Sequence, residues 1–159
     1  MDFWDQHKTI TCFYEKAGEE VCKKYGISQM EYDILMFIDA NPQYATAADI
    51  VCVRKSAKSH VSTSLKRLEE KGYIERKVDD NNKKVITIHI LDTAKPLIQE
   101  GREAQKHFMH MLSKGISHEE MMMFKDCFEK LCRNAEEILK EKGNGKVRTK
   151  EIRSHGSYL

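Results

Sequence analysis

The feature that most constrains the fold is a change of hydrophobic period at Gly72. Ahead of this glycine, apolar residues recur at helical spacing. These residues are Val61, Leu65 and Leu68. After it come two β-rich runs, 73–78 and 85–90, and in the second Ile86, Ile88 and Ile90 alternate with polar side chains, as strands do. Because glycine readily adopts the left-handed conformation that ends a helix, the sequence predicts a helix over about 57–71 that leads into an antiparallel hairpin.

Two shorter helices are expected before this helix. Capping boxes, in which a Ser or Thr is followed three residues later by an acid, mark the starts of helices. The pairs are Ser28 with Glu31, Thr46 with Asp49 and, further along the chain, Ser117 with Glu120. A turn at 54–56 separates the second short helix from the helix at 57–71. This order predicts a mainly α protein with a small two- or three-stranded antiparallel β wing, which is a winged helix-turn-helix.

Long helices are expected on both sides of this core, over about 8–24, 93–113 and 117–139. The first and last have more apolar surface than one small domain can cover, so we expect a homodimer. The expected organisation is a winged helix-turn-helix domain at 27–92, dimerisation helices at 1–26 and 93–142, and a basic flexible tail at 143–159.

Positive charge is concentrated in two parts of a chain whose net charge is only +2. Residues 54–84 hold ten Lys or Arg against five Asp or Glu, and the last twenty residues carry +4. Such segregation is typical of proteins that bind polyanions. The helix at 57–71 also exposes residues that form helices poorly, namely Ser59, Ser62, Thr63 and Ser64. We therefore expect its outer face to contact double-stranded DNA.

Other classes of protein fit the sequence less well. The longest apolar run, 34–38, is too short to cross a membrane, and residues 1–5 do not resemble a secretory signal. Five cysteines at irregular spacing suit reduced thiols, so we expect a cytoplasmic location. The chain has no Gly-rich phosphate loop, nucleophile elbow or zinc-hydrolase motif, so we expect no enzyme activity and no cofactor.

Four segments form a combination that is specific in its order and spacing. They are 27–35, 48–50, Val61 with the junction 65–76, and Asp79 with the strand that follows. With these residues the chain resembles the MarR family of bacterial transcriptional regulators over about 10–139. The resemblance implies a homodimer that presents two recognition helices to successive major grooves of a pseudo-palindromic operator.

The resemblance also implies which residues contact DNA. Five on the front of the recognition helix would face bases and phosphates: Lys58, Ser59, His60, Ser62 and Thr63. Six would grip the backbone around them: Arg54, Lys55, Lys66, Arg67, Arg76 and Lys77. Lys83 and Lys84 would form the tip of the wing.

Two departures from the family pattern change these expectations. The family's wing carries an Asp-x-Arg whose arginine enters the minor groove, whereas this chain has Asn82, Lys83 and Lys84. Lysine is a strongly hydrated point charge, so we expect mainly electrostatic wing contacts. The family's Leu-Thr start of the next helix reads Leu91-Asp92 here, so we expect Asp92 to cap that helix.

The expected function is a repressor that a small-molecule effector releases from DNA. By resemblance, the effector would bind between the helix-turn-helix and the dimerisation helices, where Phe13, Tyr14, Tyr32 and Phe108 would contribute. No metal is expected, although His107 and His110 lie one helical turn apart and are the candidates for a zinc-responsive variant. Cys12 is the candidate for a thiol-responsive variant, although we expect a buried, inert thiol. The remaining alternative is a protein-interaction module that does not bind DNA, which the missing wing arginine favours.

Overall fold

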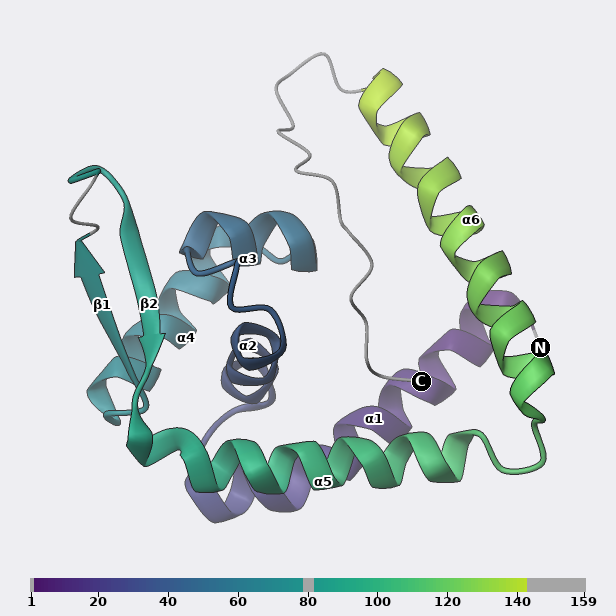
Figure 1. The fold of residues 1–159 in the computed structure, drawn as a ribbon, viewed down its shortest axis with the longest axis horizontal. Helices are drawn as coiled ribbons and strands as arrows, with labels where there is room; N and C mark the ends of the chain where they lie inside the picture. The colour runs from purple at the N-terminus through teal and green to yellow at the C-terminus, as the bar shows by residue number, and fades with distance from the viewer. Residues whose placement is uncertain (1, 79–81, 143–159) are drawn as a thin grey trace. The chain divides into compact units, whose positions relative to one another are not determined.

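The computed structural model describes residues 2–78 and 82–142. The elements are α1 (Phe3–Tyr25), α2 (Gln29–Ala40), α3 (Ala47–Arg54), α4 (Lys58–Glu70), β1 (Ile74–Val78), β2 (Ile86–Ile90), a 3-10 turn η1 (Asp92–Ala94), α5 (Lys95–Leu112) and α6 (His118–Lys142) (Figure 1). This order confirms the predicted fold class. The chain divides into two units, Met1–Phe108 and Met109–Leu159. The predicted tail at 143–159 and Asp79 lie outside the described residues.

Local signals set most helix boundaries where they were predicted, but α1 begins at Phe3 and not near residue 8, because Asp2 caps it there. Ser28 and Glu31 form a capping box at the start of α2, and Thr46 and Asp49 form one at the start of α3. The box of Ser117 and Glu120 likewise opens α6. Gly26 and Gly72 follow α1 and α4 with φ of 62° and 71°, a conformation that side chains with a Cβ disfavour.

The start of α5 differs from the prediction. Asp92 lies inside the 3-10 turn, whose N-cap is Leu91, and it makes no capping hydrogen bond. Its carboxylate instead pairs with the Lys95 ammonium at 2.8 Å. Thr93 donates its hydroxyl to the carbonyl of Gly72, which ties the turn to the end of α4. The expectation that Asp92 caps this helix was therefore wrong, because a lysine one turn ahead takes the carboxylate.

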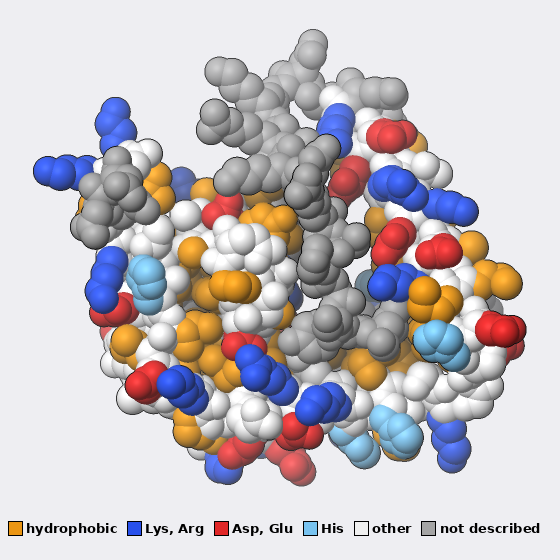
Figure 2. Space-filling view, in the orientation of Figure 1, with side chains coloured by type: hydrophobic (Ala, Val, Ile, Leu, Met, Phe, Trp, Pro, Cys, Tyr) orange, Lys and Arg blue, Asp and Glu red, His pale blue; other side chains and the backbone are white. Residues whose placement is uncertain are grey.

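The wing is a two-stranded antiparallel sheet. Its register pairs Ile74 with Ile90 and Val78 with Ile86. The amide of Ile88 also donates to the carbonyl of Ala45 at 2.7 Å, so the segment before α3 attaches to the open edge of β2. Figure 2 shows basic side chains projecting at the far end of this hairpin.

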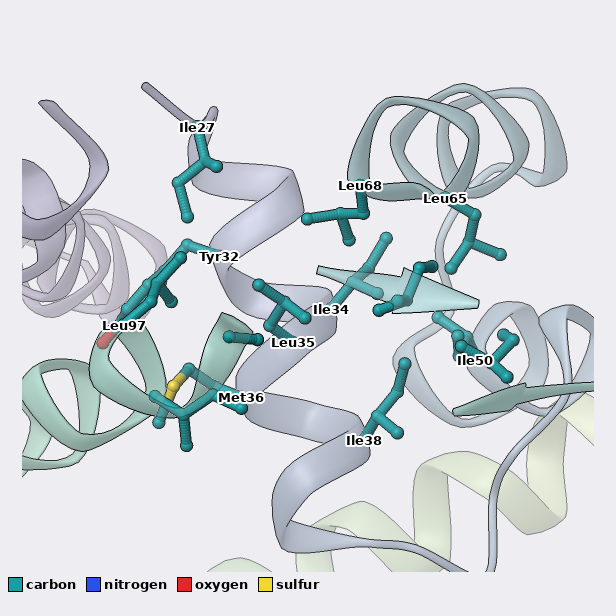
Figure 3. Close-up of a cluster of buried hydrophobic side chains, with 14 of the residues drawn as sticks. Ile27, Tyr32, Ile34, Leu35, Met36, Ile38, Ile50, Leu65, Leu68 and Leu97 are labelled. Carbon is teal, nitrogen blue, oxygen red and sulfur yellow. The ribbon is translucent and has the colours of Figure 1, made fainter. Parts of the chain in front are cut away.

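The core of the first unit forms around α2, because α1, α3, α4, α5 and the wing all contribute buried side chains next to it (Figure 3). Its largest fully buried residues include Tyr32, Ile34, Leu35, Ile50, Leu65, Leu68 and Leu97. Gly101 allows α5 to approach α2 closely, since a Cβ there would lie 2.7 Å from Met36 Sδ and 3.0 Å from the Tyr32 ring. This packing fixes α4 against α2 and so determines which face of α4 reaches solvent.

One carboxylate is buried within this core. Glu31 is 1% exposed, and its Oε2 accepts hydrogen bonds from Lys71 Nζ at 2.7 Å and from the Ser28 amide at 3.3 Å. Lys71 also donates to the carbonyl of Gly26 at 2.6 Å. Because a buried charge must be paired, Lys71 joins the end of α4 to the start of α2.

In the second unit, α6 carries an apolar stripe on its surface. The exposed members are Met123, Phe124, Phe128, Leu131, Ile138 and Leu139, and the exposed fractions run from 45% at Phe128 to 68% at Met123. Phe124, Phe128, Leu131 and Ile138 follow a helical repeat, and the first two stack with ring centroids 5.7 Å apart. Among the described residues, no helix is long and apolar enough to span a bilayer.

Candidate nucleic-acid interface

The orientation of α4 follows from its apolar face. Val61, Leu65 and Leu68 are each at most 1% exposed and bind the helix to the core. Ser64 lies between them and is 6% exposed, so it belongs to this buried face. The expectation that Ser64 lies on the outer surface was therefore wrong. The opposite face exposes Ser59, Ser62, Thr63 and Lys66, which follow the i, i+3, i+4, i+7 spacing of one helical stripe, flanked by Lys58, His60 and Arg67. Hydroxyls and cations thus occupy the side of α4 away from the core.

The turn before α4 presents its N-terminus openly. Lys55 has φ of 52°, a left-handed conformation that is uncommon for lysine, and it ends α3. Ala57 is the N-cap of α4 and provides no capping side chain, and the first turn contains no acidic residue. The backbone N–H groups and the partial positive charge of this helix end are therefore available to an anionic partner.

Apart from Arg54, four of the predicted DNA-contacting cations have acidic partners in the structure. The pairs are Lys66 with Glu70 at 3.7 Å, Arg67 with Glu31 at 3.9 Å, Lys77 with Glu75 at 2.5 Å, and Arg76 with Glu69, whose Oε2 accepts from Arg76 Nε at 2.9 Å. Side chains in these pairs other than Glu31 are at least 36% exposed. Exposed pairs contribute little stability, so a phosphate can exchange with the carboxylates at small cost.

The other predicted DNA-contacting cations are Lys55, Lys58, Lys83 and Lys84. Among the described residues, no carboxylate forms an ion pair with Lys55 or Lys58, and both are exposed. Lys83 and Lys84 are exposed at the far end of the wing, where Figure 2 shows basic side chains extending from the surface. The Asn82 side chain accepts from the Lys84 amide at 3.2 Å, so it shapes the turn at the position of the family's acidic residue.

Arg54 is placed differently from the other cations. Its guanidinium pairs with Asp33 on α2 at 3.3 Å and lies over the Phe37 ring, 5.9 Å from the centroid. The Arg54 side chain is 31% exposed, whereas those of Lys66 and Arg67 are 71% and 60% exposed. The structure therefore does not place Arg54 with the outward cations of α4.

Three of the four aromatics expected to contact an effector pack together. The ring of Phe108 lies 5.2 Å from that of Phe13 and 5.5 Å from that of Tyr14. Tyr14 donates its hydroxyl to Asp33 at 3.0 Å, and burial together with this carboxylate raises the pKa of Tyr14 to about 12. Tyr32 is 1% exposed and donates to the Gly101 carbonyl at 3.1 Å, so it fills the core between α1 and α5.

A hollow of about 510 Å³ lies along α1 and the start of α2. Its lining residues are Cys12, Glu15, Lys16, Glu19, Cys22 and Gln29. Cys12 is exposed, which corrects the expectation of a buried thiol, because the adjoining part of α1 has solvent on most of its sides. Sequence reasoning missed this polar lining, although the helical spacing of the α1 residues was a usable signal.

The two histidines that were candidates for a zinc site, His107 and His110, are both exposed on α5. Within residues 2–78 and 82–142, no group of three or more His, Cys, Asp or Glu side chains is arranged to hold a metal ion.

Sequence reasoning also missed the polar contacts that converge on Asp33. Gln29 donates to Asp33 Oδ1 at 2.9 Å, and Gln105 of α5 donates to the Tyr14 hydroxyl at 3.4 Å. Asp33 occupies an ordinary polar position in the helical pattern of α2, and the hydrogen-bonded pairs of this group are 4, 19 and 91 residues apart in sequence. Only the fold brings these groups together.

Comparison with known proteins identifies the helix-turn-helix and wing as a family feature. Residues 25–84 match the sequence model of the MarR family. No curated protein matches the chain. The family match covers α2, α3, α4 and β1, which are the elements that form the candidate interface.

Solved structures resemble the chain over most of its length. A Listeria monocytogenes protein in complex with a 26-mer DNA has a TM-score of 0.78 at 20% identity, covering 92% of this chain and 99% of that one. A MarR protein from Peptoclostridium difficile has a TM-score of 0.78 at 15% identity, covering 90% and 93%. MepR from S. aureus, in complex with DNA, has a TM-score of 0.73 at 18% identity, covering 84% and 98%. At these identities the likeness establishes the fold.

Proposed function

We propose that this chain, whose residues 25–84 match the sequence model of the MarR family, is a cytoplasmic, homodimeric transcriptional regulator that binds a pseudo-palindromic operator and represses it until a small-molecule effector binds. In this proposal residues 27–92 read the DNA, residues 1–26 and 93–142 form the dimer, and the protein catalyses no reaction. The solved complexes of similar proteins with DNA support the DNA-binding part of the proposal.

The observation that carries the proposal is the outer face of α4. It combines hydroxyls, which can donate to and accept from base edges, with the exposed Lys66 and with Lys58, which forms no ion pair with a described carboxylate. The helix rests on an apolar core, so this face stays presented when the protein is free in solution. Hydroxyls and cations together on a rigid helix suit the major groove and the phosphates at its edges.

The proposed mechanism follows from this geometry. Each α4 enters a major groove with its N-terminal turn foremost, and Lys55 and Lys58 neutralise phosphates. Lys83 and Lys84 of the wing reach the adjoining backbone as point charges. Because half-sites lie about one helical turn of DNA apart, a small change in the separation of the two recognition helices places both out of register. An effector that binds better to the mismatched arrangement would release the operator.

The aromatic cluster of Phe13, Tyr14 and Phe108 supports an effector site in the same unit. Phe13 and Tyr14 belong to α1, the helix that also lines the hollow, and α1 and α5 both contact α2. We propose that an effector binds in this region and displaces α1 relative to α2. Tyr32, which is packed in the core, would transmit this displacement without contacting the effector.

Salt-dependent binding to duplex DNA tests the proposal. The probe is the DNA upstream of the protein's own coding sequence, with a shuffled duplex for comparison. Each neutralised phosphate contributes about 0.9 to the slope of log affinity against log salt concentration. We expect Lys55→Ala/Lys58→Ala to lower the magnitude of that slope by about two.

The matched control is Lys8→Ala/Lys114→Ala, which removes the same charge from exposed positions outside the interface. Its slope should equal that of the unaltered protein. Absence of salt-dependent binding to both duplexes would contradict the proposal and favour the protein-interaction module. Equal losses of slope in the two double variants would show that the cations act without regard to position.

A further inference from the structure

The Asp33 carboxylate of α2 binds the end of α3, just before the α3–α4 turn. Arg54, the last residue of α3, pairs with Asp33 Oδ2 at 3.3 Å. The other oxygen, Oδ1, accepts from the Tyr14 hydroxyl at 3.0 Å and from the Gln29 amide at 2.9 Å. The Asp33 carboxylate is mostly buried, at 16% exposed, and so joins side chains from α1, α2 and α3.

Arg54 has little freedom to leave this arrangement. Its guanidinium lies over the Phe37 ring while it pairs with Asp33, so both a face and an edge of the group are occupied. A charge-assisted contact to a largely buried carboxylate is stronger than an exposed ion pair. Releasing Arg54 to a phosphate would also leave the Asp33 charge without its counter-ion.

The position of Arg54 in the chain gives this contact a consequence for α4. Lys55 follows immediately in a left-handed conformation, and α4 begins three residues later at Lys58. A left-handed backbone at a non-glycine residue persists only where the surrounding structure holds it. The pair of Arg54 and Asp33 holds one side of this turn.

We propose that Arg54 is a positioning residue of the DNA-binding surface. Its ion pair with Asp33 fixes the orientation of α4 and connects the α3–α4 turn to Tyr14 of α1. This inference rests on the proposed DNA-binding function. It replaces the phosphate contact that family resemblance implies for Arg54. Because Gln29 lines the hollow along α1 and also donates to Asp33, an occupant of that hollow would act on the same carboxylate.

A double-variant cycle on DNA affinity tests the inference. Arg54→Gln and Asp33→Asn remove the ion pair from either side with little change of shape. We expect each to weaken operator binding about tenfold, and the double variant to be no weaker than either single variant. The slope of log affinity against log salt should not change in any of the three. Lys58→Ala is the comparison, because loss of one phosphate contact lowers that slope by about one.

The opposite pattern would overturn the inference. If Arg54 grips phosphate, Arg54→Gln lowers the slope by about one. Asp33→Asn then leaves affinity unchanged or raises it, because the arginine has been freed. Unchanged affinity in both single variants would equally refute a positioning role.

Amide hydrogen exchange in the free protein supplies a measurement that needs no DNA. We expect Asp33→Asn to speed exchange several-fold at residues 53–57, with no change in α6. Tyr14→Phe keeps the ring against Phe108 and should give a smaller increase at the same amides. Unchanged exchange in the turn would refute the Asp33 junction. If the unaltered protein fails to bind duplex DNA, the proposed function fails, while the exchange data still decide whether the junction exists.

Discussion

At the scale of single residues, the contact between Glu31 and Lys71 is the one whose loss should affect stability most clearly. Glu31 is 1% exposed, so removing its main partner leaves a buried charge. Lys71→Met should lower the free energy of unfolding by about 2 kcal/mol, below the roughly 3 to 5 kcal/mol typical of fully buried pairs, because a third of the Lys71 side chain is exposed. Urea denaturation of the purified protein measures this change.

Lys66→Met is the matched control for that prediction. Lys66 and its partner Glu70 are 71% and 61% exposed, so losing this pair should change stability by less than about 0.5 kcal/mol. Equal effects of the two substitutions would mean that burial of Glu31 does not govern the cost.

Tyr14 should make stability depend on alkaline pH. Its pKa is raised from 10.0 to about 12, mainly by burial and then by the Asp33 charge, so the folded state keeps the phenol proton more tightly than the unfolded chain does. This contribution is complete below about pH 10 and is lost as the pH rises to about 12. Relative to Tyr14→Phe, the unaltered protein should lose about 1 to 2 kcal/mol over this range, measured by urea denaturation at several pH values. A constant difference between the two proteins would contradict the raised pKa.

At the scale of elements, substitutions on the exposed face of α4 that raise stability should weaken operator binding. Ser62 and Thr63 are exposed in the interior of the helix, where alanine is favoured over each by about 0.5 kcal/mol. Ser62→Ala/Thr63→Ala should therefore raise the free energy of unfolding by about 1 kcal/mol. The same double variant should weaken operator binding, because two hydroxyls are lost from the groove-facing stripe.

Thermal melting and duplex titration on one preparation measure the two effects together. A stabilised variant with unchanged operator affinity would show that these hydroxyls are only a polar exterior. Ser113→Ala, at the end of α5 and outside the interface, controls for the general effect of removing a hydroxyl.

The elements whose signals are local could be predicted from the sequence. The capping boxes at Ser28 and Thr46, and the change of period at Gly72, depend on neighbours within a few residues, and each has its expected place. The cap at Asp92 was predicted wrongly because a competing partner decides there, since its carboxylate pairs with Lys95. The ion pair of Arg54 with Asp33 on another helix could not be predicted, because only the fold brings the two together. Periodicity marks the exposed side of α4 but not which of its cations are already paired.

At the scale of the whole molecule, charge and apolar surface occupy different parts of the chain. The cations cluster at 54–84, whereas the exposed apolar side chains are concentrated on α6. Patches of exposed apolar surface on this scale are typical of interfaces, and their separation from the cations lets a protein bind DNA while it is assembled. The proposed dimer uses both surfaces at once.

The apolar stripe of α6 should therefore control both assembly and operator binding. Leu131 lies in the middle of the stripe and is 58% exposed, so Leu131→Glu places a charge where a second copy would pack. Sedimentation should show that the unaltered protein is a dimer at micromolar concentration and that the variant is largely monomeric. Because a monomer engages only one half-site, operator affinity should fall at least about 100-fold. Arg133→Gln on the opposite side of α6 changes the charge by the same amount and should leave both properties unchanged. A monomeric variant that still binds the full operator tightly would show that DNA recognition does not require the dimer.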